Sequence, residues 1–368
     1  MVDWLNGLLV ITGGLYITAL LWLWTGLRAG WGQLCNEQPT VSVVVAARNE
    51  AEAIGDCLDA LMQQRYGGML EIMIVDDRSS DATAQVVRGY QGQGPHPLRL
   101  LRAPDTLQYR CPKKSALACG IAASNGQLLL FTDADCQPPP DWVQSTVAQF
   151  GSEVGLVAGY SVPMRGRGWL QGVLELDNVA VAALGAGSMG RGRPLSCTGR
   201  NLAYRRTLYD QLGGFASIGH LVGGDDVYFM RLVQARTSWW QIFNSNGPAV
   251  PCKPVPIHWA AAVQQKLRHA SKAGHYRGPA MLLAVAVYLF HAGLLIGLAE
   301  MALSGRWNGW LMGVWGARWG VDLIFLGRFM RGRGQWSLLR FWPLLEILYI
   351  PYVLLFTAIG RLGWFRWK

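Results

Sequence analysis

Apolar residues are distributed along this chain in two distinct patterns. Residues 5–27 form an uncharged apolar run, and three further apolar segments follow at about 280–303, 309–327 and 341–360. A run of this length can cross the hydrocarbon core of a membrane as a helix. Between these segments, residues 40 to about 255 show short β-branched runs separated by polar stretches of helical period. The pattern predicts an α/β domain with N- and C-terminal transmembrane helices.

The central segment predicts a mostly parallel sheet. Strands are expected at VSVVVAA (41–47), EIMIVDD (71–77), LRLLRA (98–103) and QLLLFTDAD (127–135), with helices at 50–64, 79–90 and 113–124 between them. Strand–helix alternation of this kind is typical of α/β domains. Ligands of such sheets bind beyond the C-terminal ends of the strands. The polar residues at those ends are therefore the candidates for chemistry.

The composition favours a membrane setting. Hydrophobic residues make up 51% of the chain, charged residues only 15%, and many of the 17 Trp lie near the ends of apolar runs. Trp prefers the membrane interface, where its ring is half buried and its N–H is hydrated. The net charge is +10, and much of the positive charge lies in or beside the C-terminal apolar segments. Anionic headgroups explain this distribution better than nucleic acid, for which the chain shows no recognition motif.

The first apolar run and the cysteines indicate a cytoplasmic central domain. Arg28 follows the run directly, and positive charge marks the cytoplasmic side. A cleaved signal peptide is the alternative, but the region before the run carries Asp3 and no Lys or Arg, and the run is too long. The seven Cys include no CxxC pair, which indicates reduced thiols. We therefore expect an integral membrane protein of the bacterial inner membrane, with its central domain in the cytoplasm.

The C-terminal region leaves the topology open. With four crossings, Arg361, Arg366 and Lys368 would face outward, against the positive-inside rule, unless one segment is re-entrant. Arg318 and Asp322 lie four residues apart in the third apolar segment, so they can pair on one helix face directed at the protein interior or a polar cavity. We expect four parts: a transmembrane helix at 1–28, the α/β domain at 40–255, an interfacial amphipathic segment at 256–279, and a membrane region with about three helices at 280–368.

The strongest chemical signal is the TDADC segment at the end of the fourth strand. Alternation along an extended chain places the carboxylates of Asp133 and Asp135 on the same side. Such a pair can hold Mg²⁺ or Mn²⁺, and the cation would neutralise a departing diphosphate. The alternative is an ordinary strand-end turn, because Asp is common there.

Two other strand ends carry polar residues. Asp76 and Asp77 end the second strand, and the Asp77 carboxylate can accept hydrogen bonds from a nucleobase or ribose. Helix capping by the following Ser79, Ser80 or Asp81 is an alternative explanation for this polar segment. Arg48 and Glu50 follow the first strand, where a nucleotide would dock, although Glu50 also suits a helix N-terminus.

These three strand ends, in this order, resemble those of the family 2 glycosyltransferases of GT-A fold, over residues 40 to about 275. The resemblance implies a nucleotide-sugar site that includes a Lys before a helix and the DxD motif. The residues carried over to this site are Ala46, Arg48, Glu50, Asp77, Lys114, Asp133 and Asp135. A solvated lysine at a helix start is the alternative explanation for Lys114.

The resemblance extends to an acceptor side and a catalytic base. In SCTGRNLAYRR (196–206), Gly199 allows close backbone approach and Asn201 can bond to sugar or acceptor hydroxyls. Asp225 and Asp226 match the acidic pair that holds the base of the family's inverting mechanism, and we assign the base to Asp226, with Asp225 orienting or binding. A neighbouring acid can raise the pKa of such a base toward working pH. Acidic capping of a helix is the alternative.

A last motif resembles the QxxRW motif of cellulose, chitin and hyaluronan synthases. Gln265 and Arg268 match its Gln and Arg, which implies contacts to the acceptor and to the diphosphate region, but His269 replaces the Trp. The Trp forms part of the acceptor platform in those processive enzymes, so its loss weakens the case for a polymer synthase. A basic helix at the membrane surface is the alternative.

The combined expectation is an inverting, metal-dependent glycosyltransferase that moves a sugar from a nucleotide-sugar, most simply a UDP-sugar, to a lipid or lipid-linked acceptor. The layout resembles bacterial enzymes that glycosylate lipids, ceramides or carotenoids. The alternatives are a processive polysaccharide synthase subunit, a non-catalytic membrane scaffold, and a nucleotidyltransferase that shares the sheet and the acidic pair. The acceptor-side segment and the QxxR pattern argue against the nucleotidyltransferase.

Overall fold

The computed structural model describes residues 2–27, 35–166, 168–255, 258–271 and 278–361. They divide into two compact units. The sheet unit comprises Arg28–Met164 and Leu184–Lys253, and the helical unit comprises Met1–Leu27, Arg165–Ala183 and Pro254–Lys368. The four predicted parts stay a prediction, and residues 165–183, expected within the α/β domain, pack in the helical unit.

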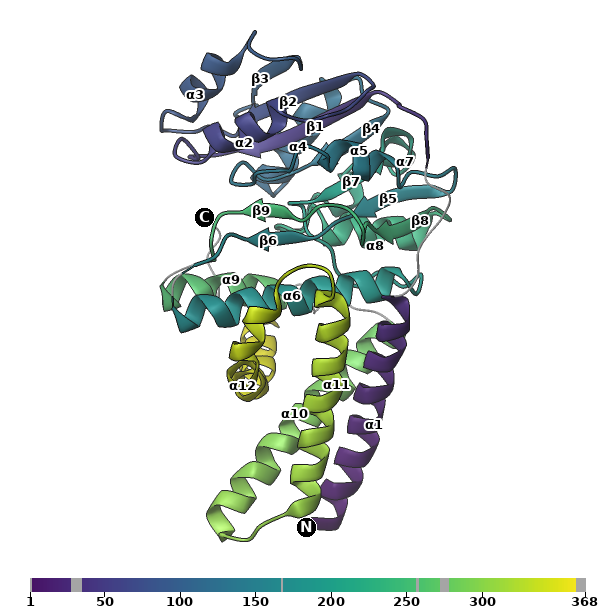
Figure 1. Cartoon of the computed structure of the whole chain (residues 1–368), viewed down its shortest axis with the longest axis vertical. Helices are drawn as coiled ribbons and strands as arrows, with labels where there is room; N and C mark the ends of the chain where they lie inside the picture. The colour runs from purple at the N-terminus through teal and green to yellow at the C-terminus, as the bar shows by residue number, and fades with distance from the viewer. Residues whose placement is uncertain (1, 28–34, 167, 256–257, 272–277, 362–368) are drawn as a thin grey trace. The chain divides into compact units, whose positions relative to one another are not determined.

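The sheet unit contains a seven-stranded sheet of order β3-β2-β1-β4-β7-β5-β8 (Figure 1). Its strands are β1 (Val41–Ala47), β2 (Leu70–Asp76), β3 (Leu98–Arg102), β4 (Leu128–Phe131), β5 (Val154–Ala158), β7 (Leu202–Arg205) and β8 (Trp240–Phe243). Only β7 runs antiparallel to its neighbours in this sheet, so the predicted mostly parallel α/β fold is confirmed. The short strands β6 (Ser161–Pro163) and β9 (Val250–Cys252) pair separately.

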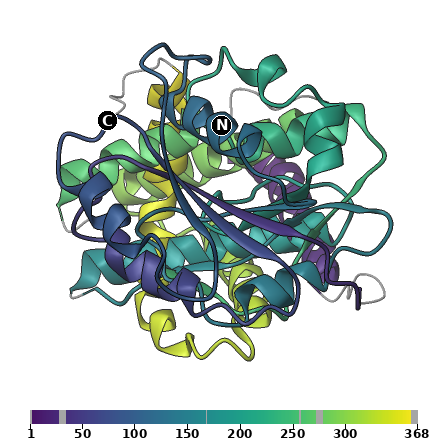
Figure 2. The ribbon, with the colours of Figure 1, turned by 90° about the horizontal axis from the view of Figure 1, so that it is seen from above.

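Both faces of the parallel part of the sheet are covered, which explains its continuous apolar strands. Val43 and Val45 of β1 belong to a core cluster with Ile54 and Leu58 of α2 (Ile54–Met62). On the other face α4 (Pro112–Ala122) approaches so closely that a Cβ on Gly120 would lie 2.6 Å from the Val44 side chain. The other helices are α3 (Thr83–Tyr90), α5 (Trp142–Val147), α7 (Arg206–Gln211), η1 (Ala216–Ile218) and α8 (Val227–Arg236), and Figure 2 shows strands and helices from a second direction.

The helical unit is built on long helices. They are α1 (Val2–Gly26), α6 (Trp169–Met189, whose C-terminal end belongs to the sheet unit), α9 (Trp259–Ser271), α10 (Pro279–Ser304), α11 (Gly309–Met330) and α12 (Trp342–Arg361), with the short 3-10 helix η3 (Trp336–Phe341) before α12. Helices α1, α10 and α11 lie side by side (Figure 1). Leu5 and Leu9 of α1 pack against Phe290, Leu294 and other apolar residues in their core.

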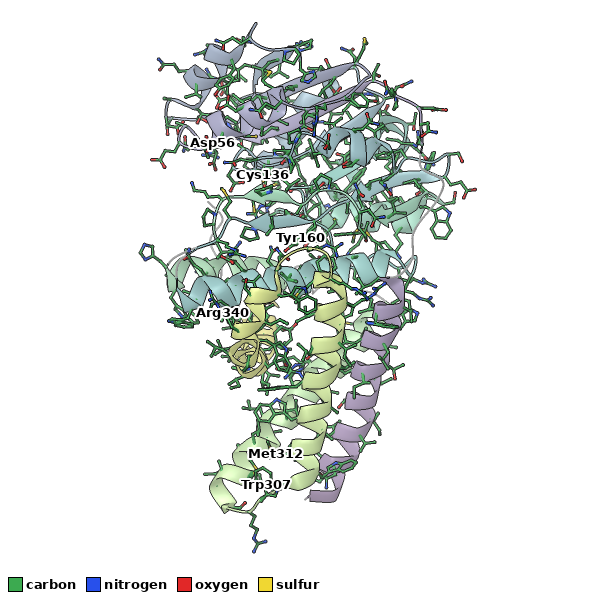
Figure 3. The ribbon with its side chains drawn as sticks, in the orientation of Figure 1. Asp56, Cys136, Tyr160, Trp307, Met312 and Arg340 are labelled. Carbon is green, nitrogen blue, oxygen red and sulfur yellow. The ribbon has the colours of Figure 1, made fainter. Side chains whose placement is uncertain are left out.

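Three helices in the described residues are long and apolar enough to cross a membrane: Trp4–Gly26, Ala280–Ser304 and Trp336–Ile359. The predicted N- and C-terminal apolar helices are thus present. Trp307 and Arg340 lie toward opposite ends of the helical unit, as Figure 3 shows. Arg28, Arg366 and Lys368, on which the predicted orientation partly depends, lie outside the described residues.

Helix α11 is not among these three helices, and it carries the charged residues Arg318, Asp322 and Arg328. The predicted pairing of Arg318 with Asp322 is confirmed, with Arg318 Nε 3.5 Å from Asp322 Oδ2. Arg318 is only 1% exposed, and its Nη2 lies 2.8 Å from Glu346 Oε2 of α12. The Tyr16 hydroxyl of α1 donates to Asp322 Oδ1 at 2.7 Å. Arg318 and Asp322 of α11 therefore each have a partner on a neighbouring helix.

Candidate active site

Three loops meet at one edge of the sheet. In the strand order, β1 lies between β2 and β4, and the three strands are parallel. Their carboxyl ends therefore open at the same edge, where α/β proteins bind ligands. Arg48 follows β1, Asp76 and Asp77 lie at the end of β2, and Asp133 and Asp135 follow β4.

Hydrogen bonds tie the first two loops together. Asn49, in the left-handed region with φ 54°, donates its N–H to Ser79 Oγ at 3.0 Å, and its side-chain oxygen accepts from Ser80. The Glu50 N–H donates to Thr83 Oγ1 at 2.8 Å. Asn tolerates this backbone conformation better than most residues do. These hydrogen bonds hold the loops after β1 and β2 together.

The predicted nucleotide-binding residues differ in their exposure. Arg48 is exposed and Ala46 is half-buried, whereas Asp77 is buried and pairs with the guanidinium of Arg78. A cavity of about 450 Å³ opens beside Asp76 and Arg78. The predicted roles of Ala46, Arg48, Glu50 and Asp77 stay predictions.

A lysine that the sequence analysis did not select connects the acidic motifs. Lys113 Nζ lies 2.5 Å from Asp133 Oδ1 and 3.7 Å from Asp225 Oδ2, and Arg200 Nε lies 3.5 Å from the other oxygen of Asp133. Burial alone would raise the pKa of Asp133, but Lys113 and Arg200 outweigh it and hold that pKa below its usual value. Burial would likewise lower the pKa of Lys113, but Asp133 and Asp225 raise it. The DxD segment and the acidic pair thus share one cluster of charges.

Lys114, the lysine selected from the sequence, has a different environment. Its side chain is fully buried, and its ammonium donates to the carbonyls of Ile218 at 2.8 Å and Leu221 at 2.9 Å. Lys113, and not Lys114, thus lies among the carboxylates at the strand ends, and nucleotide binding by Lys114 stays a prediction. Consecutive helical residues point about 100° apart, so only one of two adjacent lysines can face the site. The sequence alone did not indicate which one.

Asp226 is both the predicted base and the cap of a helix. It is the N-cap of α8, where its Oδ1 accepts from the Val227 N–H at 2.6 Å. Its Oδ2 accepts from the Gly199 N–H at 3.2 Å. A Cβ on Gly199 would lie 3.3 Å from Asp225 Oδ2, so glycine permits this close approach. The capping alternative thus holds for Asp226, and it is compatible with a catalytic role because each carboxylate oxygen can accept further hydrogen bonds.

Asn201 is used inside the protein. Its side-chain oxygen accepts from the Trp142 indole N–H at 2.9 Å, and its amide nitrogen donates to the Tyr160 carbonyl at 3.0 Å. The residue is only 4% exposed. Acceptor binding by Asn201 stays a prediction, and the observed contacts give it a structural role at the start of β7.

The two motif carboxylates fit a hard divalent cation. Asp133 and Asp135 are partly exposed at the strand end, and carboxylate oxygens are what Mg²⁺ and Mn²⁺ prefer. Among the described residues no group of three His, Cys, Asp or Glu could hold a metal ion by itself. A site with one or two carboxylates, completed by water and phosphate oxygens, is usual for Mg²⁺.

The QxxR segment belongs to the helical unit. Gln265 is half-buried on α9, and Arg268 lies on the same helix, but the side chains of Arg268 and His269 are outside the part of the chain whose side chains are described. Positions 265 and 268 share one face because they are three residues apart. The predicted contacts of Gln265 and Arg268 stay predictions.

Comparison with models of known protein families shows the family to which the chain belongs. The model of the family described as "Glycosyl transferase family 2" matches residues 42–213. A second model, described as "Glycosyl transferase family group 2", matches residues 128–364, which is more than half of the chain. The chain belongs to the family 2 glycosyltransferases. The resemblance noted from the strand-end motifs is thereby confirmed.

Two curated relatives of this glycosyltransferase match parts of it. Glycosyltransferase AglE of Haloferax volcanii is 33% identical over 123 residues, covering 33% of this chain and 39% of the relative. Probable glycosyltransferase YdaM of Bacillus subtilis is 28% identical over 190 residues, covering 50% of this chain and 45% of the relative. The chain thus spans less than half the length of either relative.

One solved structure matches the glycosyltransferase over nearly its whole length. It is the mannosyltransferase PcManGT from Pyrobaculum calidifontis in complex with GDP-Man and Mn²⁺, with a TM-score of 0.62. It is 21% identical in sequence, and the match covers 97% of this chain and 99% of that one. At this identity the similarity establishes the fold.

Proposed function

We propose that this glycosyltransferase moves a hexose from a nucleotide-sugar, most simply a UDP-sugar, to a lipid or lipid-linked acceptor at the cytoplasmic face of the bacterial inner membrane. The observation that carries the proposal is the charge cluster in which Lys113 lies between Asp133 and Asp225. It joins the segment suited to a metal–diphosphate complex with the segment suited to a base. A donor and an acceptor hydroxyl could therefore be held within one site.

The arrangement supports an inverting transfer. The acceptor oxygen would attack the anomeric carbon as its proton passes to a carboxylate oxygen of Asp226, and the bond from that carbon to the diphosphate would break. Lys113 and Arg200 would bring positive charge toward the departing diphosphate, as Arg and Lys do in other phosphate sites. A divalent cation held by Asp133 and Asp135 would neutralise further charge on the leaving group.

Membrane attachment is supported by the helical unit. Three helices in the described residues meet the length and apolarity needed to span a bilayer, and Arg318 and Asp322 of α11 contact Glu346 of α12 and Tyr16 of α1. Charged residues within a membrane-embedded helix are almost always buried in the protein and paired. We infer that α11 crosses the membrane beside α1 and α10, and that exposed Trp and Arg side chains at the helix ends contact lipid headgroups.

A lipid acceptor is favoured over a growing polysaccharide for two reasons. The helical unit offers few spanning helices for a polymer channel, and position 269 carries His where processive synthases carry Trp. The nucleotide is a more open choice. PcManGT binds GDP-Man, so GDP-sugars belong in the donor test beside UDP-sugars.

The proposal is tested with the full chain in lipid nanodiscs. Radiolabelled UDP- and GDP-sugars would be incubated with a total membrane lipid extract and Mn²⁺ or Mg²⁺. We expect an organic-extractable labelled product that forms with one donor and disappears with EDTA.

The other outcomes discriminate between the alternatives. Label in a high-molecular-weight aqueous fraction would replace the lipid transferase with a polysaccharide synthase. An absence of turnover and of donor binding with every donor would favour the non-catalytic scaffold. Transfer that EDTA leaves unchanged would remove the metal from the mechanism.

A further inference from the structure

The two connections on either side of α11 differ in charge. Residues 328–341, from the last turn of α11 to the start of α12, contain no Asp or Glu and four arginines: Arg328, Arg331, Arg333 and Arg340. Residues 305–308, between α10 and α11, contain Arg306 as their one charged residue. Figure 3 shows Arg340 and Trp307 toward opposite ends of the helical unit. Of these two connections, only the one before α12 is strongly basic.

The start of α6 lies against the basic connection. Arg165 Nη2 is 3.5 Å from the hydroxyl oxygen of Ser337, and a Cβ on Gly172 would collide with the ring of Phe341. The guanidinium carbon of Arg340 lies 4.7 Å from the centre of that same ring. All these residues belong to the helical unit. Arg165 therefore shares one surface with the arginines of the connection, although it lies far from them in the sequence.

The side chains of this surface are available to a ligand. Arg165, Arg331 and Arg340 are exposed, and in the described part of the chain none of the three forms an ion pair with a carboxylate. Arg333 is half-buried, with its guanidinium carbon 4.2 Å from the centre of the Phe329 ring. We call these four residues the arginine surface: Arg165, Arg331, Arg333 and Arg340.

The nearest acidic residues along the chain do not neutralise this surface. Glu175 is 6% exposed and accepts the Gly166 N–H at 2.8 Å. Glu346 is 4% exposed and pairs with Arg318 inside the helical unit. Both carboxylates are therefore used inside the protein, and the arginine surface keeps its positive charge.

Exposed tryptophans flank the arginine surface. Trp336 is 51% exposed and Trp169, at the start of α6, is 56% exposed. Trp336 lies over the last turns of α11, because a Cβ on Gly327 would be 3.6 Å from its ring. Trp side chains favour the level of the lipid headgroups, and short basic connections between spanning helices stay in the cytoplasm. The arginine surface therefore suits the cytoplasmic headgroup layer.

The charge of the surface favours one class of headgroup. A guanidinium can bind two oxygens of a phosphate at once. In an anionic phospholipid such as phosphatidylglycerol the phosphate charge is not compensated, whereas phosphatidylcholine carries its own cation, which the arginines would repel. Basic segments next to a spanning helix are attracted to anionic lipids by about fivefold in affinity for each Arg or Lys.

We propose that the arginine surface is a binding site for the phosphate of anionic phospholipids in the cytoplasmic leaflet. This binding selects headgroup charge at one end of the helical unit, which goes beyond general contact of Trp and Arg with lipid. It rests on the proposed membrane attachment and is independent of the identity of the sugar donor and acceptor.

The test measures binding of radiolabelled short-chain phosphatidylglycerol and phosphatidylcholine to the full chain in detergent micelles. We expect the wild type to bind phosphatidylglycerol at least about tenfold more tightly. Arg331→Gln/Arg340→Gln removes two positive charges and should weaken that binding by about 25-fold, with phosphatidylcholine binding unchanged. Arg331→Lys/Arg340→Lys keeps the charge and should retain most of the preference.

Two variants control for the loss of an arginine elsewhere. Arg306→Gln is the matched control, because it removes the charge of the other connection of α11. Arg65→Met removes an arginine of the sheet unit whose side chain is 70% exposed. Both should bind phosphatidylglycerol within about twofold of the wild type, and Tm should be the same in all variants.

The predicted side of the membrane is tested separately by cysteine labelling. Ser337→Cys and Arg306→Cys would be treated with an impermeant maleimide in intact bacterial spheroplasts, with the wild type as background. We expect labelling of Arg306→Cys alone, and labelling of Ser337→Cys only after the cells are opened.

Four results would overturn the proposal. They are equal affinity of the wild type for the two lipids, wild-type phosphatidylglycerol binding by Arg331→Gln/Arg340→Gln, and labelling of Ser337→Cys in intact spheroplasts. The fourth is displacement of phosphatidylglycerol by an equal concentration of inorganic phosphate, which would assign the surface to a soluble phosphate. A failure of the proposed membrane attachment is distinguishable from all four, because the wild type would then not sediment with membranes.

Discussion

The two units of the molecule use charged residues in opposite ways. At the sheet edge, Lys113 and Asp133 pair while their side chains remain 37% and 29% exposed. In the helical unit, Arg318 and Glu346 pair with side chains that are 1% and 5% exposed. A pair of a basic side chain and a carboxylate, at a similar separation, is thus open to a ligand in one unit and closed to it in the other.

This difference in exposure distinguishes an ion pair that can bind a ligand from an ion pair that only holds helices together. A half-exposed pair can exchange its partner for a phosphate or a metal ion, because water and ligand reach both groups. A fully enclosed pair cannot exchange partners without opening the helices around it, so it fixes how those helices pack. If this distinction is correct, substitutions at the sheet edge should affect turnover before stability, and substitutions in the helical unit should do the reverse.

Asp226→Asn is the largest change expected at the sheet edge. The amide cannot take a proton from the acceptor, and loss of a general base typically lowers kcat by about 10²–10⁴-fold. Asn is also a good N-cap, so α8 should keep its start and Tm should change little. Transfer kinetics and labelled-donor binding check this. Normal turnover in the variant would remove Asp226 as the base.

Asp135→Ala tests the metal assignment. We expect donor affinity in Mn²⁺ to fall at least about tenfold, because hard cations in such sites depend on one or two carboxylates. EDTA should weaken donor binding by the wild type and have little further effect on the variant. Equal donor binding by both proteins, with and without EDTA, would contradict the assignment of Asp133 and Asp135 as ligands.

Arg318→Met tests the opposite behaviour in the helical unit. Removing the guanidinium leaves Asp322 and Glu346 buried without their counter-charge, which should destabilise the unit by about 3–5 kcal/mol. Thermal unfolding in nanodiscs measures the change. Near Tm of the wild type the variant should lose activity, but well below it donor affinity should be normal. A variant with unchanged Tm would show that the enclosed cluster does not hold the helices.

Much of the fold could be predicted from the sequence, and so could the segments that contribute carboxylates to the charge cluster. The β-branched runs gave the parallel strands, because a strand buried on both faces must be apolar throughout. The DxD segment and the acidic pair could be recognised because the first follows an apolar run typical of a strand and the second follows a glycine-containing segment typical of a loop. The Arg318–Asp322 pair was predictable because four residues bring two side chains together on a helix.

Contacts between distant segments could not be predicted in this way. Lys266 pairs with Asp177, 89 residues away, and nothing local to either residue indicates the other. The antiparallel insertion of β7 between β4 and β5 likewise depends on tertiary pairing. Asn201 has the residue type of an acceptor ligand, yet its amide is bonded to Trp142 and Tyr160.

Lys114→Met should have a smaller effect than Arg318→Met, and on stability rather than turnover. The carbonyls of Ile218 and Leu221 would lose their buried donor, which costs about 1–3 kcal/mol. Denaturant unfolding of the variant checks this, with Arg65→Met as a surface control that should change stability by less than about 1 kcal/mol. A Lys114→Met enzyme of normal stability but impaired donor binding would restore Lys114 as the nucleotide-facing lysine.

Lys113→Met should shift a pH profile. In the wild type Lys113 and Arg200 hold the pKa of Asp133 below its usual value, against the effect of burial. A carboxyl with a lowered folded-state pKa contributes stability above its unfolded pKa and loses it as the pH falls through the folded value. Without Lys113 the pKa of Asp133 rises, so metal-dependent donor binding should begin to fail at a higher pH than in the wild type. Donor binding measured from neutral to acid pH checks this, and an acid limb at the wild-type position would show that Lys113 does not govern the charge of Asp133.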